Sequence, residues 1–317
     1  MKLPSEYRAG VVASCIAISL ALGMLQQVIG GTFNKDAPPP GWFHVFSIDR
    51  ETYAISEPMY WQQNVSYLLL GTKRALLFDT GPGIYGIRKV VESVTKLPLV
   101  VIPSHLHFDH VGNLNEFDTV ELFDTPALRA QVHNGYFTES ATQFMLSRTE
   151  TFRVHGWLKD RQIIELGNRP VTLVSTPGHT PDSVSLVDAS RRRMFSGDLV
   201  NRLVTLCDVP GSDIHAMANS LHDLISLAPG DSPAYEAHAE IPLQPLELKA
   251  LATGVVNIAN GNEKPVPACL GGLPMKRYDI GAFPILLPAD GGRALQPLSS
   301  AIETLDWLNG ACDGNTR

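Results

Sequence analysis

Histidine and aspartate crowd residues 104–110, which read SHLHFDH and directly follow the apolar run LPLVVIP. In an extended segment alternate side chains share a face, so His105, His107 and Asp109 can converge on one point. His110 has the opposite parity and joins them only if the chain turns into a helix there. Imidazole and carboxylate suit zinc, and also iron, cobalt or manganese. Two converging groups of ligands predict two adjacent metal ions.

Three further candidate ligands follow predicted strands elsewhere in the chain. His179 lies in the segment STPGHT at the end of one strand, Asp198 ends FSGD, and His238 lies in YEAHAE. A single histidine in a strand is more often a hydrogen-bonded polar residue than a ligand. Beside the 104–110 cluster, however, the three together predict that distant segments complete one site.

Apolar periodicity predicts the elements that must position these residues. Strands are expected at 67–71 and 75–83, followed by a helix over 87–96 and a strand over 98–105. The ligand-rich loop then lies at the carboxyl end of a buried strand, where α/β folds place their chemistry. The later elements expected are strands at 170–178, 183–189, 192–198 and 234–241, helices at 125–134, 213–227 (with Asp213 as N-cap) and 245–260, and one late strand within 278–288.

Composition bounds the class of protein. The 317 residues are 44% apolar and 18% charged, which is enough for a large core in one or two domains. A net charge of −7 without a basic run argues against a nucleic-acid partner, so we expect a small-molecule substrate. Neither CxxC nor G-x-S-x-G occurs, which excludes a thiolate zinc knuckle and disfavours a serine hydrolase. The oligomeric state is left open.

The N-terminus differs from the rest of the chain. Residues 9–25 (AGVVASCIAISLALGML) carry no charge and follow a basic start, as in a signal peptide or an N-terminal membrane anchor. We therefore expect an exported protein, periplasmic or secreted, with membrane attachment through residues 9–25 under the second interpretation. The expected organisation is a leader at 1–30, an extended Pro-rich linker at 31–44, a catalytic domain at 45–290 and a tail at 291–317.

Taken together, these motifs resemble the metallo-β-lactamase-fold hydrolase superfamily, in its glyoxalase II and lactonase-like branch. The resemblance covers roughly residues 45–260 and rests on DTGPG (79–83), HLHFDH (105–110), TPGHT (176–180), SGD (196–198) and His238. It implies an α/β fold, a four-layer αβ/βα sandwich with the site along one edge of two sheets.

The resemblance also assigns ligand roles. His105, His107 and His179 would hold a first metal, Asp109, His110 and His238 a second, and Asp198 would bridge the two. Asp79 would steady the histidine loop from behind, and Gly81 and Gly83 would allow its tight turn.

The chemistry implied is hydrolysis by a hydroxide that bridges two Zn²⁺ or other divalent transition metals. The expected substrate is an ester, a lactone or a thioester, with Asp109 as the catalytic residue that relays a proton. A bridging aspartate favours these branches over true β-lactamases. Two alternatives stay open: an exported β-lactam hydrolase, and an iron-dependent oxidoreductase on the same scaffold.

The segment EPMYWQQN (57–64) is a candidate substrate lip. Tyr60 and Trp61 could pack against an acyl chain or ring. The same two aromatic residues could equally cover the edge of the sheet.

Overall fold

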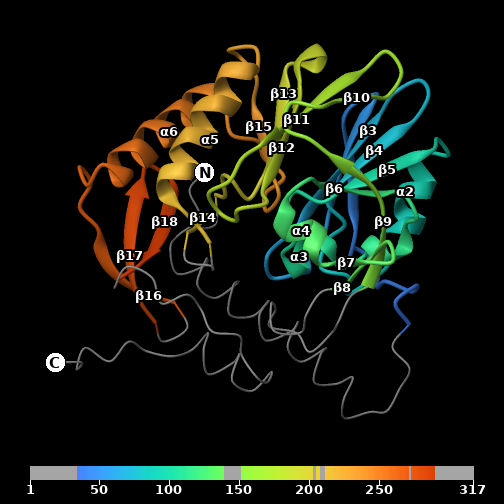
Figure 1. Ribbon diagram of the computed structural model, residues 1–317, viewed down its shortest axis with the longest axis horizontal. Coiled ribbons are helices and arrows are strands. Elements are labelled where there is room, and N and C mark those ends of the chain that lie inside the picture. Colours follow the sequence, from blue (N-terminus) through green and yellow to red (C-terminus); the bar gives the residue numbers. More distant parts are fainter. Residues whose placement is uncertain (1–33, 139–150, 203–204, 208–210, 271–272, 290–317) are drawn as a thin grey trace, which may run out of the picture.

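The computed structural model describes residues 34–138, 151–202, 205–207, 211–270 and 273–289, and its largest element is a nine-stranded sheet (Figure 1). The strands at its centre are parallel where β4, β5, β6 and β9 meet, and antiparallel toward both edges. In spatial order they are β1 (His44–Asp49), β2 (Thr52–Ser56), β3 (Val65–Leu70), β4 (Ala75–Phe78), β5 (Leu99–Ile102), β6 (Val120–Phe123), β9 (Thr151–Leu158), β8 (Tyr136–Thr138) and β7 (Val132–His133).

A second sheet packs face to face with the first. Side chains of the inner strands alternate between two cores, as a period of two requires. In β5, for example, Val100 and Ile102 join the core between the sheets, whereas Val101 joins the core under the outer helices. The strands of this second sheet, in spatial order, are β10 (Ile163–Glu165), β11 (Pro170–Ser175), β12 (Val184–Asp188), β13 (Arg193–Gly197) and β15 (Ala234–Glu236).

Helices cover the outer face of each sheet (Figure 1). The long helix α5 begins at the predicted cap, where the Asp213 carboxylate accepts hydrogen bonds from the His215 and Ala216 amides. The layers are therefore helix, sheet, sheet and helix, which confirms the predicted four-layer α/β sandwich. Outside the first sheet lie α2 (Arg88–Val94), α3 (Phe108–Val111), η1 (Leu114–Glu116) and α4 (Pro126–Ala130); α5 (Ile214–Leu227) and α6 (Pro245–Ala259) lie outside the second, and η2 (Ala189–Arg191) joins β12 to β13.

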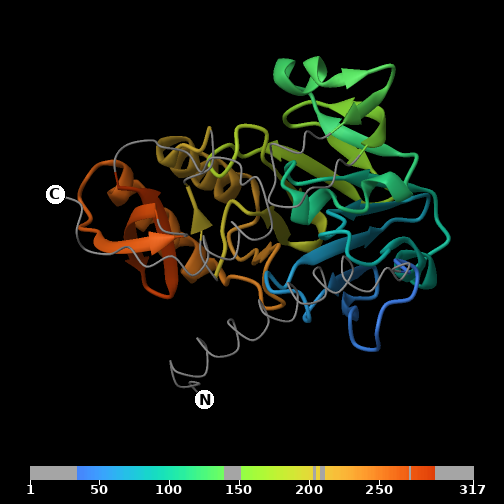
Figure 2. The same ribbon diagram turned by 90° about the horizontal axis from the view of Figure 1, so that it is seen from below.

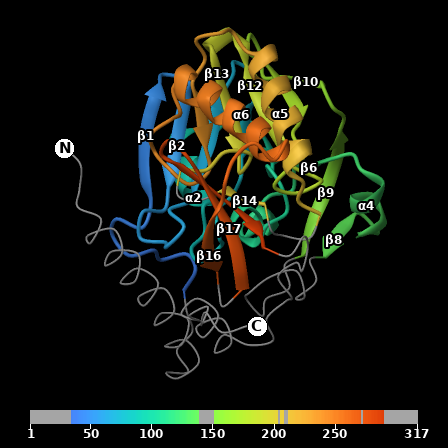
Figure 3. The ribbon, with the colours of Figure 1, turned by 90° about the vertical axis from the view of Figure 1, so that its left-hand side faces the viewer.

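A third, smaller sheet packs against α5 and α6, on the side of the molecule away from β7 and β8 (Figures 2 and 3). Its strands, in spatial order, are β14 (Thr205–Leu206), β18 (Phe283–Pro288), β17 (Leu273–Ile280) and β16 (Val266–Leu270). The single strand expected within 278–288 is wrong, because the chain reverses at Gly281. This glycine has a φ of 62°, and β17 and β18 form a hairpin around it.

Several predicted elements are shorter in the structure. The helix expected over 125–134 ends after Ala130, because Asn134 and Gly135, both at positive φ, form the turn of the β7–β8 hairpin. The strands expected to reach Gly83 and Ile241 end at Phe78 and Glu236. The residues that follow each of these two strands form loops that lie at the candidate site.

The Pro-rich segment is not extended as predicted. It turns at 35–36 and 40–41, and it buries the Trp42 side chain, which is 2% exposed and donates a hydrogen bond from Nε1 to Glu57 Oε2 at 2.6 Å. Burial of a large aromatic side chain outweighs the extended preference of the prolines. The predicted leader at 1–30, with its uncharged run at 9–25, and the tail at 291–317 lie outside the described residues. Within the described ranges, no helix combines the length and apolarity needed to cross a membrane.

A buried ion pair joins the two large sheets. The Arg169 guanidinium, at the start of β11, lies 2.6 Å from the Asp188 carboxylate at the end of β12. It also donates to the carbonyl oxygens of Glu51 and Leu70 and to the hydroxyl of Thr52, all in the first sheet. Both charged side chains are at most 1% exposed, so the pair fastens the sheets through hydrogen bonds that water does not share.

We predict that Arg169→Met destabilises the protein by about 3–5 kcal/mol, because it leaves the Asp188 carboxylate buried without its partner. The double variant with Asp188→Asn should recover part of this loss. Arg161→Ala, which removes a surface pair with Asp223, should change stability by about 0–1 kcal/mol. Urea unfolding of the four proteins measures these differences, and equal stabilities for Arg169→Met and Arg161→Ala would contradict the expectation.

Candidate metal centre

All seven predicted ligands lie at one edge of the two large sheets. Strands β4 and β5 are parallel, so the loops that follow them leave the first sheet at the same edge. Strands β11, β13 and β15 also run in one direction, so His179, Asp198 and His238 leave the second sheet together. The loop between β2 and β3, residues 57–64, returns to the first sheet at this edge as well.

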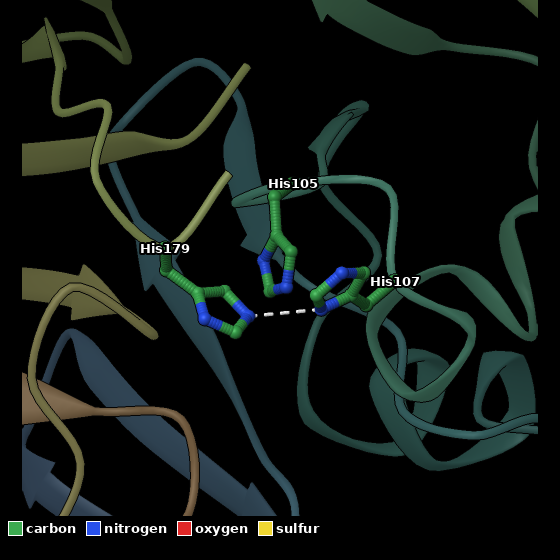
Figure 4. A group of neighbouring side chains, drawn as sticks. All are labelled: His105, His107 and His179. Carbon is green, nitrogen blue, oxygen red and sulfur yellow. Dashed lines mark hydrogen bonds between the residues drawn. The ribbon is translucent and has the colours of Figure 1, made fainter. Parts of the chain in front are cut away.

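His105, His107 and His179 form a first ligand group (Figure 4). One ring nitrogen from each lies within 4.8 Å of the other two, and His179 Nε2 is 2.9 Å from His107 Nδ1. His105 and His107 come from the loop after β5, whereas His179 comes from the loop after β11. The structure thus brings together three imidazoles from both sheets, as the sequence predicts.

Asp109, His110 and His238 form a second ligand group. Asp109 Oδ2 lies 3.4 Å from His110 Nε2 and 3.6 Å from His238 Nε2. The turn that brings His110 to the same side as Asp109 is α3, the short helix expected from its parity. All three side chains are at most 3% exposed.

Asp198 lies between the two groups. Its Oδ2 is 3.7 Å from His179 Nε2 of the first group, and its Oδ1 is 3.5 Å from His110 Nε2 of the second. His238 Nε2 lies 3.0 Å from Asp198 Oδ1. Asp198 Oδ2 also lies 3.1 Å from His238 Nε2, so Oδ2 is close to both groups and Oδ1 is close to the second.

Asp79 supports this arrangement from behind. Its Oδ1 accepts the Ser104 amide at 2.6 Å and its Oδ2 lies 3.0 Å from His110 Nδ1. A proton on His110 Nδ1 satisfies the Asp79 carboxylate and leaves the Nε2 lone pair facing Asp109 and Asp198. Gly81 and Gly83 have φ of 69° and 73°, and a Cβ on Gly83 would come within 2.2 Å of the Gly112 carbonyl oxygen. These positions therefore require glycine.

The donor set fits divalent transition metals. His105 Nε2 and His110 Nε2 are buried and have no hydrogen-bond partner in the part of the chain that the structure describes. An unsatisfied buried polar atom costs about 1–3 kcal/mol, a cost that coordination to a cation would remove. Imidazole nitrogens and carboxylate oxygens are the ligands that zinc and its neighbours take in proteins.

Electrostatics keep most of these groups in the state that a metal needs. Burial lowers the pKa of His105 well below its ordinary value, and burial together with His179 lowers that of His107 to about 3. Burial alone would raise the pKa of the Asp109 carboxyl, but the His110 and His238 imidazoles outweigh it and hold that pKa below its usual range. Against the effect of burial, the Asp109 and Asp198 carboxylates raise the pKa of His110 well above its ordinary value and that of His238 to about 9, so these two imidazoles must each lose a proton when a cation binds.

Comparison with known proteins adds a decisive match. The family model for the metallo-beta-lactamase superfamily matches residues 59–237, which is more than half of the chain. The chain belongs to the metallo-beta-lactamase superfamily.

Members of the superfamily with similar sequences include two hydrolases. The acyl-coenzyme A thioesterase MBLAC2 of Homo sapiens is 28% identical over 217 residues, 59% of this chain and 76% of the relative. The hydroxyacylglutathione hydrolase GloC of Haemophilus influenzae is 24% identical over 165 residues, 50% of this chain and 77% of the relative. With the family match and the ligand clusters, these relatives identify the chain as a metal-dependent hydrolase.

A solved member of the superfamily shares the fold. The metallo-beta-lactamase from Pontibacter korlensis matches 68% of this chain and 99% of its own with a TM-score of 0.52, at 16% identity. The solved structure of VMB-1 matches 70% of this chain and 100% of its own, also with a TM-score of 0.52, at 15% identity. At these identities the likeness concerns the fold alone.

Two side chains at the site were missed by sequence reasoning. Gln62 and Asn64 each donate a side-chain hydrogen bond to Asp109 Oδ2, at 2.9 and 3.1 Å, and Asn64 also donates to the Asp109 carbonyl. The only signal was a run of amides, QQN, between the aromatic pair and an apolar strand. Such a run equally suits a solvated loop.

The predicted substrate lip divides into two parts. Tyr60 is 4% exposed and packs with Trp42 and Tyr85, so its ring covers the sheet edge and does not offer an exposed surface. Burial raises the pKa of the Tyr60 hydroxyl well above its usual value, and the nearby Asp109 charge adds to this effect. Trp61 is only partly buried against the same cluster, and its contact with a substrate stays a prediction.

Glu57, at the start of the 57–64 segment, is another buried carboxyl, and the sequence analysis does not single it out. Burial raises its pKa to about 8, against the opposing effects of the Trp42 hydrogen bond and Lys35. The Glu57 Oε1 atom lies where a Cβ on Gly81 would be, so this side chain fills the space behind the 79–83 turn.

We predict that Asp79→Asn lowers metal affinity by about 10- to 100-fold, since it removes the carboxylate that orients His110. Asparagine tolerates the left-handed backbone of this position, where φ is 65°, so the fold should be retained. Competition with a chromophoric chelator measures the affinity. Asp118→Asn, at an exposed aspartate in the loop before β6, is the matched control, and equal affinities for the two variants would show that Asp79 plays no such part.

Proposed function

We propose that the chain is a dinuclear thioesterase that directs a water shared between two divalent cations, Zn²⁺ or a similar metal, at the carbonyl carbon of a thioester. The observation that carries this proposal is the position of Asp198 between the two ligand groups. A carboxylate that lies close to both groups is suited to bridge two cations. An enzyme with a single cation would need no such shared ligand.

The thioester is chosen over other acyl substrates because of the relatives. Both are named for hydrolysis of thioesters, one of acyl-coenzyme A and one of hydroxyacylglutathione. Esters and lactones present the same acyl carbon and belong to the same class of reaction. A β-lactam amide and an iron-dependent oxidation are the competing outcomes of the test below.

In this proposal, residues of the chain orient the catalytic carboxylate and accept the proton of the attacking water. When bound, a pair of divalent cations lowers the pKa of a shared water and polarises the substrate carbonyl. Asp109 accepts the proton of the attacking water, because His110 and His238 keep its carboxylate ionised despite burial. Gln62 and Asn64 hold that carboxylate by Oδ2.

Export from the cytoplasm is a further part of the proposal, and it rests on the sequence alone. Residues 1–30 would act as a leader or anchor, residues 45–290 as the catalytic domain and residues 291–317 as a tail. N-terminal sequencing of the mature protein, with cell fractionation, tests the leader. A cytoplasmic protein that keeps its first residues would contradict it.

We predict that the purified protein hydrolyses acyl-coenzyme A or hydroxyacylglutathione, and that chelation abolishes the activity. Return of Zn²⁺ or another divalent transition metal should restore it, because the donor set holds the cations reversibly. The assay compares these thioesters with a homoserine lactone and a chromogenic cephalosporin. A preference for the cephalosporin, or oxygen uptake with an iron-loaded protein, would overturn the thioesterase proposal.

We predict further that Asp109→Asn lowers kcat by about 10²- to 10⁴-fold, the usual contribution of a positioned general base. Asparagine keeps the size of the side chain but cannot accept the proton. Asp118→Asn should retain the activity of the unmodified protein. If Asp109→Asn retained it too, Asp109 would not be the proton acceptor.

A further inference from the structure

One residue of the 57–64 loop contacts two members of the second ligand group. The side chain of Gln62 donates from Nε2 to Asp109 Oδ2 at 2.9 Å, and its main-chain carbonyl lies 2.9 Å from His238 Nδ1. Asp109 follows β5 of the first sheet, whereas His238 follows β15 of the second. Gln62 therefore links two ligands that reach the site from different sheets.

The chemistry of each contact fixes its direction. An ionised carboxylate only accepts hydrogen bonds, so the amide nitrogen of Gln62 must face Asp109. A main-chain carbonyl also only accepts, so a proton of His238 must lie on Nδ1. In the structure Nε2 lies 3.1 Å from Asp198 Oδ2 and donates to that carboxylate, so Nε2 is the ring nitrogen that a cation would take in place of a proton.

The backbone around Gln62 is shaped to hold both contacts. Gln63 has a φ of 52°, a left-handed conformation that is unfavourable for a residue with a side chain, and its amide donates to the Tyr60 carbonyl at 2.9 Å. Two residues on, the Val65 amide donates to the Ala237 carbonyl at 2.7 Å, directly before His238. The turn is thus attached to the His238 loop at two points.

We propose that Gln62 is a positioning residue of the second ligand group: it sets the placement of Asp109 relative to His238 and fixes the tautomer of His238. The inference rests on the part of the proposed function in which this group binds a cation. It does not depend on which substrate is hydrolysed. Residues that orient metal ligands in this way change metal affinity by about 10- to 100-fold when they are replaced.

Two substitutions separate positioning from packing. Gln62→Ala removes both the size of the side chain and its N–H donor, while it keeps the main-chain contact with His238. Gln62→Met keeps the size but removes the N–H donor without adding a charge. A residue that only fills space would tolerate the methionine and not the alanine, whereas a positioning donor tolerates neither.

The experiment is a titration of the full-length, metal-free protein with Co²⁺ or Zn²⁺, followed by calorimetry or by competition with a chelator. The unmodified protein should take up two equivalents. In Gln62→Ala the affinity for one equivalent should fall by about 10- to 100-fold while the other is unchanged, and Gln62→Met should lose a similar amount. Gln63→Ala, which truncates the exposed neighbouring glutamine, should match the unmodified protein.

Three results would overturn the inference: uptake of one equivalent by the unmodified protein, an equal loss of both equivalents in Gln62→Ala, or unchanged binding in Gln62→Met. Thermal unfolding of the metal-free variants checks that each one is folded. If the titrations behave as expected but no thioester is hydrolysed, the substrate proposal fails while the role of Gln62 stands.

Discussion

The Asp79 carboxylate is the contact on which the site depends. It joins the end of β4 to the loop after β5 through the Ser104 amide and the His110 ring. That loop carries four of the seven predicted ligand side chains. The backbone of Asp79 is left-handed, with a φ of 65°. The placement of these four side chains, two in each ligand group, therefore depends on this anchor.

The ligand set could be predicted from sequence because its signal is local. The spacing of His105, His107 and Asp109 follows from the parity of an extended chain, and the other ligands each follow a recognisable strand. Gln62 and Asn64 could not be found this way. Their partner Asp109 is 47 and 45 residues away in the chain, and His238 is 176 residues from Gln62. Contacts of that range arise only from the arrangement of the sheets.

The same distinction explains the errors in the fold. Long amphipathic segments such as 213–227 and 245–260 have boundaries in the structure close to those predicted, because periodicity and caps are written into the sequence. The predictions were wrong for two short segments. The Asn134–Gly135 turn ends a helix that propensity alone would extend. The segment around Trp42 is not extended as expected, because the Trp42 side chain packs into a buried aromatic cluster.

The ion pair of Arg169 and Asp188 lies at the ends of β11 and β12 opposite to those that lead into the ligand loops. The two halves of the molecule are therefore held together at that end by protein groups alone. Small zinc domains, in contrast, have no stable fold until the metal arrives. We therefore expect this chain to fold before a metal binds.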